Sequence, residues 1–327
     1  MQRHELLLKM LADGRFHSGE QIAAALGCSR SAVWKRIRQV REIPGLEIDS
    51  VTGRGYRLRE PLELLDSELI LQHLPTERRA TLHRLEVLGS VGSTNTLALQ
   101  DAPVPGRGSA WLAEHQSDGR GRRGRTWVSP YGRNIYFSLA WRFDMPLAEL
   151  SGLSVATGAV LSEVLQAHGL RGHGLKWPND LLWQGRKLAG ILLEANGEAE
   201  GPATAVIGIG INLDLDDRYA GQHIDQPYAS LRDAGVKAER NRLAADLLDA
   251  SMSMCVEFSR EGLAPFLETW KRYDAFRDRP VRLTGPNSEL HGQYLGLAND
   301  GGLCLMVGDK AQTFYAGELS LRAGESP

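Results

Sequence analysis

Residues 116–127 concentrate cations and flexible residues in a way that could bind an anion. Four arginines alternate with three glycines between Gly119 and Arg125. A guanidinium can hold phosphate or carboxylate oxygens through two parallel hydrogen bonds, and glycine lets backbone N–H groups approach a ligand closely. Because like charges repel and glycine costs order, we expect this loop to stay mobile until an anion organises it. An RNA-binding arginine-glycine patch and a disordered linker are the alternatives.

The residues after this loop favour a folded setting. Trp127 and an alternating apolar and polar run at 134–141 indicate a strand beside the loop. Two further apolar runs, 175–183 and 186–194, predict strands joined as a hairpin at 184–185. Lys187 begins the second strand, where its ammonium could neutralise charge between departing phosphates. An ordinary surface lysine is the alternative.

Three more patterns could contact a polar ligand. Residues 93–95 are Ser-Thr-Asn and open a predicted helix whose N–H groups can bind an acceptor, although this is also ordinary N-cap composition. Asn179 and Asp180 could read a purine edge or hold Mg²⁺ through oxygen. Residues 205–213 alternate glycine with apolar residues, so either a ligand or a packed helix must approach the glycine face.

The elements that must position these residues divide the chain into three. Its 327 residues predict two or three domains, and 42% hydrophobic with 24% charged residues excludes disordered and membrane classes. We expect no apolar stretch near the roughly 18 residues that a membrane span needs. The cysteines at 28, 255 and 304 lack C-x-x-C spacing, so we expect reduced thiols in a cytoplasmic protein, with neither zinc nor disulfides.

The first sixty residues predict a winged helix-turn-helix. They carry eleven Lys or Arg against seven Asp or Glu. Ser18 and Gln21 have capping-box spacing, and Ser29 caps a second helix that turns Val33, Ile37 and Val40 inward. Strands at 46–51 and 56–58 form the wing. The predicted DNA contacts are Ser29, Arg30, Ser31, Trp34, Lys35 and Arg54, the last at the wing tip. A small helical domain that binds protein is the alternative.

We therefore predict an α+β chain with three domains. Residues 1–62 form the winged helix and residues 63–276 a mixed α/β catalytic domain, which includes a short helix at 69–74. Residues 277–327 form a small β-barrel, because apolar and polar residues alternate there around a hairpin turn at 299–302.

Taken in order, these motifs resemble the biotin-protein ligases. The motifs are Ser93-Thr94-Asn95, Gly119-Arg120-Gly121-Arg122-Arg123-Gly124, Lys176-Trp177-Pro178-Asn179-Asp180, Lys187-Leu188-Ala189-Gly190-Ile191-Leu192 and Gly208-Ile209-Gly210-Ile211-Asn212. The N-terminal domain and the ending Gly317-Glu318-Leu319-Ser320-Leu321-Arg322 resemble the bacterial type that also represses the biotin operon. The resemblance covers nearly the whole chain, and it implies a class II synthetase-like catalytic domain with an SH3-like barrel.

The resemblance implies an enzyme that activates biotin with ATP and Mg²⁺ and transfers it to a lysine of the biotin carboxyl carrier protein of acetyl-CoA carboxylase. It assigns catalysis to Arg120, Arg122 and Lys187. It assigns biotin contacts to Ser93, Thr94, Asn95, Gln116, Arg120, Gly121, Arg122 and Lys187, and adenylate contacts to Arg122, Trp127, Asn179, Asn212 and Tyr228. Asn179 and Asn212 would help to place Mg²⁺, and Tyr228 would cover adenine where related proteins have tryptophan.

The resemblance also implies partners. Adenylate binding would favour a homodimer that binds operator DNA, and residues 191–195 would pair between subunits if they lie at a sheet edge. A lipoate-type ligase and a non-enzymatic biotin-sensing regulator are the alternatives.

Overall fold

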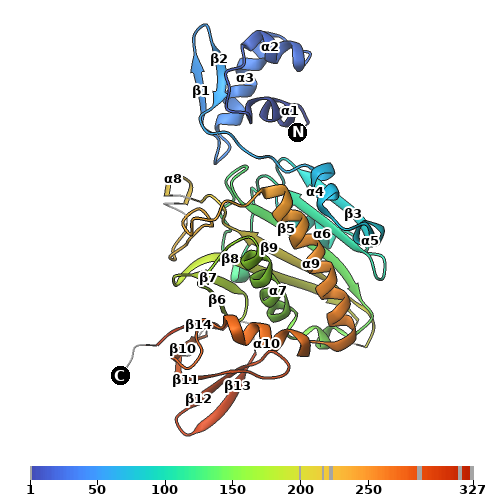
Figure 1. The fold of residues 1–327 in the computed structure, drawn as a ribbon, viewed down its shortest axis with the longest axis vertical. Coiled ribbons are helices and arrows are strands. Elements are labelled where there is room, and N and C mark those ends of the chain that lie inside the picture. Colours follow the sequence, from blue (N-terminus) through green and yellow to red (C-terminus); the bar gives the residue numbers. More distant parts are fainter. Residues whose placement is uncertain are drawn as a thin grey trace.

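The computed structural model describes residues 2–198, 200–215, 217–220, 224–285, 289–315 and 319–324. Figure 1 shows the N-terminal helices and hairpin at one end, a large sheet with helices in the middle, and a small group of strands at the other end. The α+β fold class predicted from the sequence is thus confirmed.

The N-terminal part is a helix-turn-helix with a wing, as predicted. It comprises α1 (Gln2–Leu11), α2 (Gly19–Ala25), α3 (Arg30–Arg41), β1 (Ile48–Val51) and β2 (Gly55–Leu58). The Ser18–Gln21 capping box is present, and Ser29 Oγ accepts a hydrogen bond from the backbone of Ala32 at the start of α3. Val33, Ile37 and Val40 are at most 1% exposed. Local capping and a 3.6-residue apolar period therefore determine these helices.

The central part is a seven-stranded mixed sheet in the order β3-β4-β5-β9-β8-β7-β6. Its elements are α4 (Ser67–His73), α5 (Thr76–Thr81), β3 (Leu82–Leu88), α6 (Thr94–Leu99), β4 (Gly108–Ala113), β5 (Ile135–Phe143), α7 (Leu153–Ala167), β6 (His173–Lys176), β7 (Asp180–Trp183), β8 (Arg186–Gly197), β9 (Ala203–Ile211), α8 (Asp217–Ala220), α9 (Arg240–Glu261) and α10 (Ala264–Tyr273). Helices α7, α9 and α10 pack together over one face of the sheet. Helix α6 packs on β4, β5 and β9. Its residue Ala98 clusters with Ala140 of β5, whereas Leu139, the preceding residue of β5, belongs to the main core. Because side chains alternate between the two faces of a strand, α6 covers the face of the sheet opposite to α7, α9 and α10.

The prediction of one continuous strand over 175–183 was wrong. The chain forms β6, turns at residues 177–179 through a cis Trp177–Pro178 bond, and returns as β7. Proline lacks the N–H that a central strand requires, which favours a turn at this point. The turn pairs Lys176 directly with Asp180 across the two strands.

Strand β8 has one edge without a strand partner over its second half. Residues Arg186–Gly190 pair with β7, whereas β9 alone pairs with the stretch from Leu192 to Gly197 among the described strands. The edge position that a pairing between subunits requires is therefore present from Leu192 to Ala195, whereas the backbone N–H and carbonyl of Ile191 already bond to Asn179.

The C-terminal part is a curled five-stranded antiparallel sheet. Its strands are β10 (Pro280–Thr284), β11 (Glu289–Leu297), β12 (Leu303–Val307), β13 (Lys310–Phe314) and β14 (Ser320–Ala323), in the order β13-β12-β11-β10-β14. The predicted hairpin at 299–302 joins β11 to β12. Within the described ranges β13 and β14 do not pair, so the sheet has the strand content of the predicted barrel without its closure. Gly317 and Glu318 lie outside the described residues.

One segment is longer and more apolar than we expected. Leu147–Ala167 satisfies the length and composition of a membrane-crossing helix, yet 56% of its most apolar window is buried inside the protein. It contains α7, whose apolar residues pack in the core under the central sheet. The apolar character of the segment is that of a core helix.

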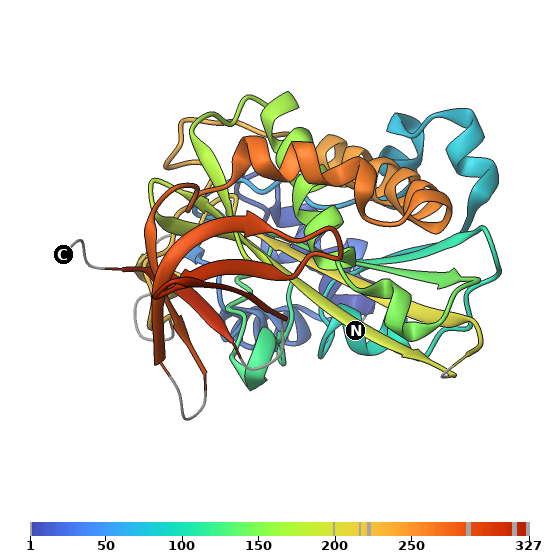
Figure 2. The same ribbon diagram turned by 90° about the horizontal axis from the view of Figure 1, so that it is seen from below.

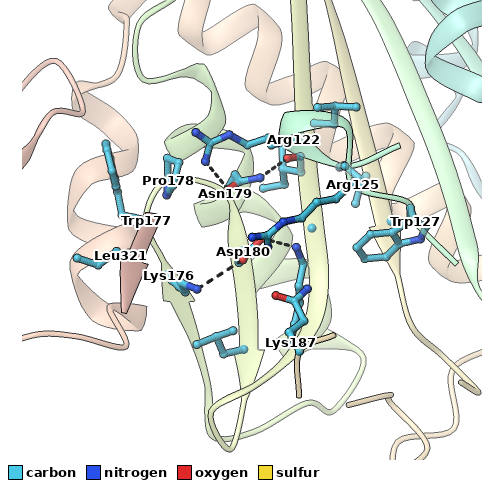
Figure 3. Close-up of a pocket in the computed structure, with 18 of the residues that line it drawn as sticks. Arg122, Arg125, Trp127, Lys176, Trp177, Pro178, Asn179, Asp180, Lys187 and Leu321 are labelled. Atoms are coloured by element: carbon cyan, nitrogen blue, oxygen red, sulfur yellow. Dashed lines mark hydrogen bonds and ion pairs between the residues drawn. The ribbon is translucent and has the colours of Figure 1, made fainter. Parts of the chain in front are cut away.

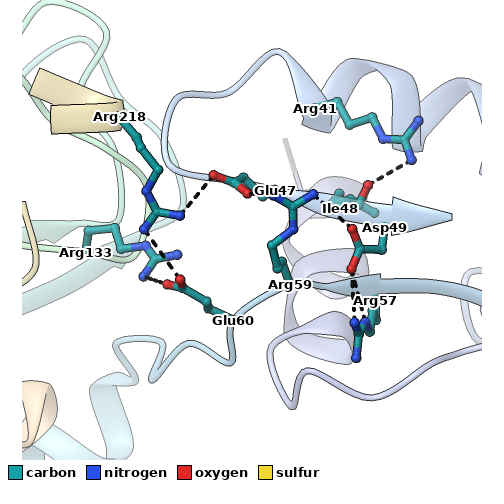
Figure 4. Close-up of polar contacts among 9 residues, drawn as sticks. All are labelled: Arg41, Glu47, Ile48, Asp49, Arg57, Arg59, Glu60, Arg133 and Arg218. Carbon is teal, nitrogen blue, oxygen red and sulfur yellow. Dashed lines mark hydrogen bonds and ion pairs between the residues drawn. The ribbon is translucent and has the colours of Figure 1, made fainter. Parts of the chain in front are cut away.

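Ion pairs join the winged helix to the central part (Figure 4). Arg133 is 6% exposed and donates to Glu60 at 2.6 Å and to Asp214 at 2.7 Å. Arg218 contacts Glu47 at 3.3 Å and Glu60 at 3.4 Å. The hydrogen bond from Arg133 is the main cause that lowers the pKa of Glu60 below its ordinary value. These contacts orient the N-terminal helices relative to the sheet.

Candidate functional site

A cleft of about 1070 Å³ opens over the central sheet (Figure 3). The loop at 116–127 forms one wall, and the turns and strands between β6 and β8 form the other. Ten of the residues that we singled out for a small-molecule site line this cleft: Ser93, Thr94, Asn95, Gln116, Arg120, Gly121, Arg122, Trp127, Asn179 and Lys187.

Strand register explains why these side chains share one face of the sheet. Gly190 pairs with both Asp180 and Gly210, so these three positions face the same side. A β-bulge between Leu181 and Leu182 lets Leu182 pair with Lys187. The bulge adds one residue to β8 between these two pairs. With regular pairing the side chain of Lys187 would point to the opposite face of the sheet, because side chains alternate along a strand. The bulge therefore places the Lys187 ammonium on the same face as the Asp180 carboxylate.

Cations surround a single carboxylate at the centre of the cleft. Lys187 Nζ lies 2.7 Å from Asp180 Oδ1, and Lys176 Nζ lies 3.9 Å from Asp180 Oδ2. These three side chains are each less than 20% exposed. Arg122 donates to Asn179 Oδ1 at 3.1 Å, as Figure 3 shows. The negative charge of Asp180 thus lies among several positive side chains, which include Arg125 as well as Arg122, Lys176 and Lys187, in a partly desolvated space that favours an anionic ligand.

Burial changes the acid-base behaviour of this group. Desolvation is the main cause that lowers the pKa of Arg122, and the charge of Asp180 partly opposes it. Desolvation likewise lowers the pKa of Lys176, and the positive charges of Lys187 and Arg322 lower it further. A bound phosphate would relieve these repulsions, since an opposite charge favours the protonated form of each base.

Lys176 and Arg322 are site residues that sequence reasoning did not assign, and the role of Asp180 as the partner of two lysines was not foreseen. Asp180 was considered only as a purine or Mg²⁺ ligand, and Lys176 and Arg322 only as parts of motifs. All three line the cleft. The signal for Lys176 and Asp180 was the spacing Lys176-x-x-x-Asp180 across Pro178, which becomes an ion pair only when the chain turns there.

A hydrogen-bonded network forms the end of the cleft at α6. The backbone N–H and the hydroxyl of Thr94 both donate to Gln116 Oε1, at 2.9 and 3.1 Å. Ser138 Oγ lies 2.7 Å from Thr94 Oγ1 and donates to Asn95 Oδ1 at 2.6 Å. Because Gln116 satisfies the first N–H of α6, this end is a preformed polar surface.

The alternating glycines of β9 accommodate side chains of the protein itself. A Cβ at Gly208 would lie 2.2 Å from Asn95 Oδ1, and a Cβ at Gly210 would lie 2.5 Å from the Trp127 ring. The packed-helix reason for the glycine face is therefore confirmed at Gly208, since Asn95 belongs to α6, and at Gly210 the side chain that approaches is Trp127, which lines the cleft. The Trp127 Nε1 is buried without a hydrogen-bond partner among the described residues.

The other residues of the loop are held in different ways. Arg120 donates to Thr96 Oγ1 at 3.0 Å and lies 3.7 Å from Glu194, so it does not join the group around Asp180. The backbone N–H of Gly121 donates to the carbonyl of Arg125 at 2.7 Å. Arg123 has φ 59°, a left-handed conformation that closes this short turn.

Asn212 and Tyr228 do not line the cleft. Asn212 is 4% exposed, and its Nδ2 donates to the carbonyl of Ala229 at 3.1 Å. The backbone of Lys187 bonds to the carbonyl of Pro227 and to the N–H of Ala229, on either side of Tyr228. These contacts fix the strand that carries Lys187.

The implied Mg²⁺ has no cage of protein oxygens in the described part of the chain. No three His, Cys, Asp or Glu side chains cluster there, and Asn179 and Asn212 already make hydrogen bonds within the protein. This donor set fits an ion that is held mainly by substrate phosphates and water, as Mg²⁺ commonly is.

The predicted DNA-binding residues come from α3, its N-cap and the tip of the wing. Ser29, Arg30, Ser31, Trp34, Lys35 and Arg54 are all exposed, with Trp34 at 51%. The Arg38 guanidinium lies 5.2 Å from the centroid of the Trp34 ring. Helix α3 thus presents polar, cationic and aromatic groups outward, as a recognition helix does.

The fold and the cleft define a class of protein in which an anion-binding ligase domain is linked to a DNA-binding module. The model of the HTH domain matches residues 3–57. The model of the Biotin/lipoate A/B protein ligase family matches residues 88–212, and that of the Biotin protein ligase C terminal domain matches residues 278–322.

Whole-chain relatives define the family further. The bifunctional ligase/repressor BirA of Escherichia coli is 40% identical over 319 residues, which are 98% of this chain and 97% of that protein. BirA of Bacillus subtilis is 32% identical over 95% of both chains. The structure of the biotin protein ligase from Aquifex aeolicus in complex with biotin and ATP has a TM-score of 0.63 and 26% identity, and covers 74% of this chain and 100% of that one. The chain belongs to the bifunctional biotin-protein ligase and repressor family.

Proposed function

We propose that this chain activates biotin with ATP, transfers the biotinoyl group to a lysine of a biotin carboxyl carrier protein, and represses biotin synthesis genes when the adenylate is bound. The observation that carries the enzymatic part is the convergence of Arg122, Lys187 and Lys176 on Asp180 in one cleft. The observation that carries the regulatory part is the exposed face of α3.

The cations match the charge that develops during activation. A biotin carboxylate oxygen attacks the α-phosphorus of ATP, the bond from that phosphorus to the bridging oxygen breaks, and pyrophosphate leaves. Lys187 and Lys176 can neutralise the leaving phosphates, and Arg122 can bind the carboxylate or the adenylate phosphate. Mg²⁺ would supply further charge neutralisation on the phosphates.

Transfer requires that water stay out until the acceptor arrives. The lysine amine attacks the carbonyl carbon of the adenylate, AMP leaves with the bridging oxygen, and the amine loses a proton. The loop at 116–127 borders the cleft and is rich in glycine, so we propose that it closes over the adenylate. Arg120 would then leave Thr96 and Glu194 to reach the ligand.

We assign the two ends of the cleft from their chemistry. The network of Thr94, Asn95 and Gln116, with Ser93 beside it in the cleft wall, offers donors and acceptors for the polar ring of biotin. Trp127 and Asn179 would contact the nucleotide. Asn212 would act by holding the strand that carries Lys187, and Tyr228 would need a movement of its segment to cover adenine.

Pyrophosphate release tests the enzymatic part. The purified chain is incubated with ATP and either biotin or lipoate. We expect pyrophosphate release with biotin and none with lipoate. Release with lipoate but not with biotin would favour the lipoate-type ligase, and no release with either acid would favour a non-enzymatic regulator.

We further propose that the protein is cytoplasmic and that its domains are residues 1–62, 63–276 and 277–327.

We also propose that the adenylate-bound form is a homodimer. The edge of β8 from Leu192 to Gly197 supports a pairing of sheets between subunits. Sedimentation with and without biotin and ATP measures this, and equal dimer fractions would contradict it. A gel-shift with the upstream DNA of the chain's own gene tests repression.

A further inference from the structure

The segment before α2 forms part of the wing. The backbone N–H of His17 donates to the carbonyl of Tyr56 at 2.8 Å, and the N–H of Tyr56 donates to the carbonyl of His17 at 2.9 Å. A Cβ at Gly55, whose φ is 102°, would lie 2.0 Å from the His17 carbonyl oxygen. Glycine at 55 therefore permits a close backbone contact that fixes Phe16 beside the wing.

The ring of Phe16 holds two wing cations. The guanidinium carbon of Arg54 lies 4.1 Å from the ring centroid, and that of Arg57 lies 4.7 Å from it. Both distances are within the range of a cation–π interaction. The ring attracts a guanidinium without neutralising it, because its charge distribution is a quadrupole.

Only one of these two cations is compensated. Arg57 Nε and Nη2 both donate to the carboxylate of Asp49 at 3.2 Å (Figure 4). No carboxylate in the described ranges pairs with Arg54, which is exposed at the tip. Phe16 therefore fixes the direction of an arginine whose positive charge stays available.

The wing and the recognition helix share one surface. A Cβ placed on Gly19 would lie 3.8 Å from the Tyr56 ring and 3.9 Å from Arg30 Nε. Arg30 is the first residue of α3, so the base of the wing and the N-terminus of the recognition helix meet at this point. A duplex that contacts α3 can thus reach Arg54 as well.

We propose that Phe16 is a positioning residue for DNA binding, which holds the Arg54 guanidinium ready for a backbone phosphate. The proposal deepens the repressor function and rests on it. A long arginine side chain loses rotamer freedom when it binds, and a ring that already restricts it reduces that loss. No sequence motif marks Phe16, because it lies outside both the recognition helix and the hairpin.

The salt dependence of DNA binding tests the proposal. The full-length chain with biotin and ATP is titrated with a duplex carrying the upstream region of its own gene, between 50 and 200 mM KCl. Each lost phosphate contact reduces the slope of log K against log salt by about 0.9. A bound homodimer carries two copies of Arg54, so Arg54→Ala is expected to reduce the slope by about 1.8. Phe16→Leu keeps the charge and the apolar bulk, so a reduced slope there reports misplacement of Arg54.

Control variants separate positioning from a merely structural role. Phe16→Tyr keeps the ring and should retain the wild-type slope. Arg57→Ala removes the cation that Asp49 already compensates, and it should change the slope by less than half the Arg54→Ala effect. The double variant with Phe16→Leu and Arg54→Ala should bind no more weakly than Arg54→Ala alone, because both substitutions disrupt the same contact between Arg54 and a phosphate.

An unchanged slope in Phe16→Leu or in Arg54→Ala, or additive losses in the double variant, would overturn the proposal. Thermal unfolding checks each variant, and Phe16→Met replaces Phe16→Leu if the latter fails to fold. If the wild-type chain does not bind the duplex at all, the repressor function fails instead. That outcome is distinct from a normal wild-type slope with unaffected variants.

Discussion

Gly210→Ala should disturb the cleft through the Trp127 ring. The added Cβ would lie 2.5, 2.6 and 2.8 Å from three ring atoms, where ordinary contact begins at 3.4 Å. The backbone at 210 cannot retreat easily, because it pairs with Tyr136 on β5 and with Gly190 on β8. The ring must therefore move by about 1 Å, and overpacking of this kind costs about 1 to 3 kcal/mol.

Movement of this ring should reach the catalytic groups. Trp127 is tied to the loop by its backbone N–H, which donates to the carbonyl of Gly119 at 2.8 Å, and Lys187 Nζ lies 5.5 Å from the centroid of the Trp127 ring. A displacement of about 1 Å near reacting groups can slow a reaction by about 100-fold. We expect a loss of that order in biotin-dependent pyrophosphate release, together with a changed tryptophan emission.

Ile207→Val is the matched control in the same strand. Ile207 is fully buried and does not line the cleft, and loss of its methyl group should cost about 0.5 to 1.5 kcal/mol. Calorimetry should therefore show both variants destabilised, while only Gly210→Ala loses activity. Wild-type melting temperature and wild-type pyrophosphate release in Gly210→Ala would refute this reasoning.

Three further results are expected. Lys187→Met should slow biotin-dependent pyrophosphate release by about 100- to 1000-fold, the usual effect of losing one group that stabilises transition-state charge, and an unchanged rate would remove Lys187 from catalysis. Arg240→Met should cost about 3 to 5 kcal/mol in urea unfolding, because it leaves Glu114 buried without its 2.7 Å ion pair; a loss below 1 kcal/mol would mean that the pair adds little. The pKa of Glu60 is lowered by Arg133, so its contribution to stability is present above its ordinary value near 4.5 and is lost as pH falls through the lower folded value. Glu60→Gln should make unfolding measured from pH 6 to pH 3 less sensitive to acid, and an acid limb as steep as the wild type's would contradict this.

Much of the fold was determined by short-range patterns in the sequence. Ser18 and Ser29 cap the helices where we predicted, and Val33, Ile37 and Val40 point inward because a 3.6-residue period specifies one face. Such features depend on neighbours within a few residues, so the chain itself carries the information. The family was readable for the same reason, since its motifs are contiguous.

The centre of the cleft was decided only by the tertiary structure. Asp180 meets Lys176 because the chain turns at Pro178, and it meets Lys187 because a bulge in the β7–β8 pairing reverses the face of that lysine. Arg122 arrives from a loop that is far away in sequence. Periodicity within one strand cannot reveal a bulge, because the register depends on how two strands pair. Residue types therefore predicted an anion-binding enzyme, while strand pairing and packing determined which cations lie around the carboxylate of Asp180.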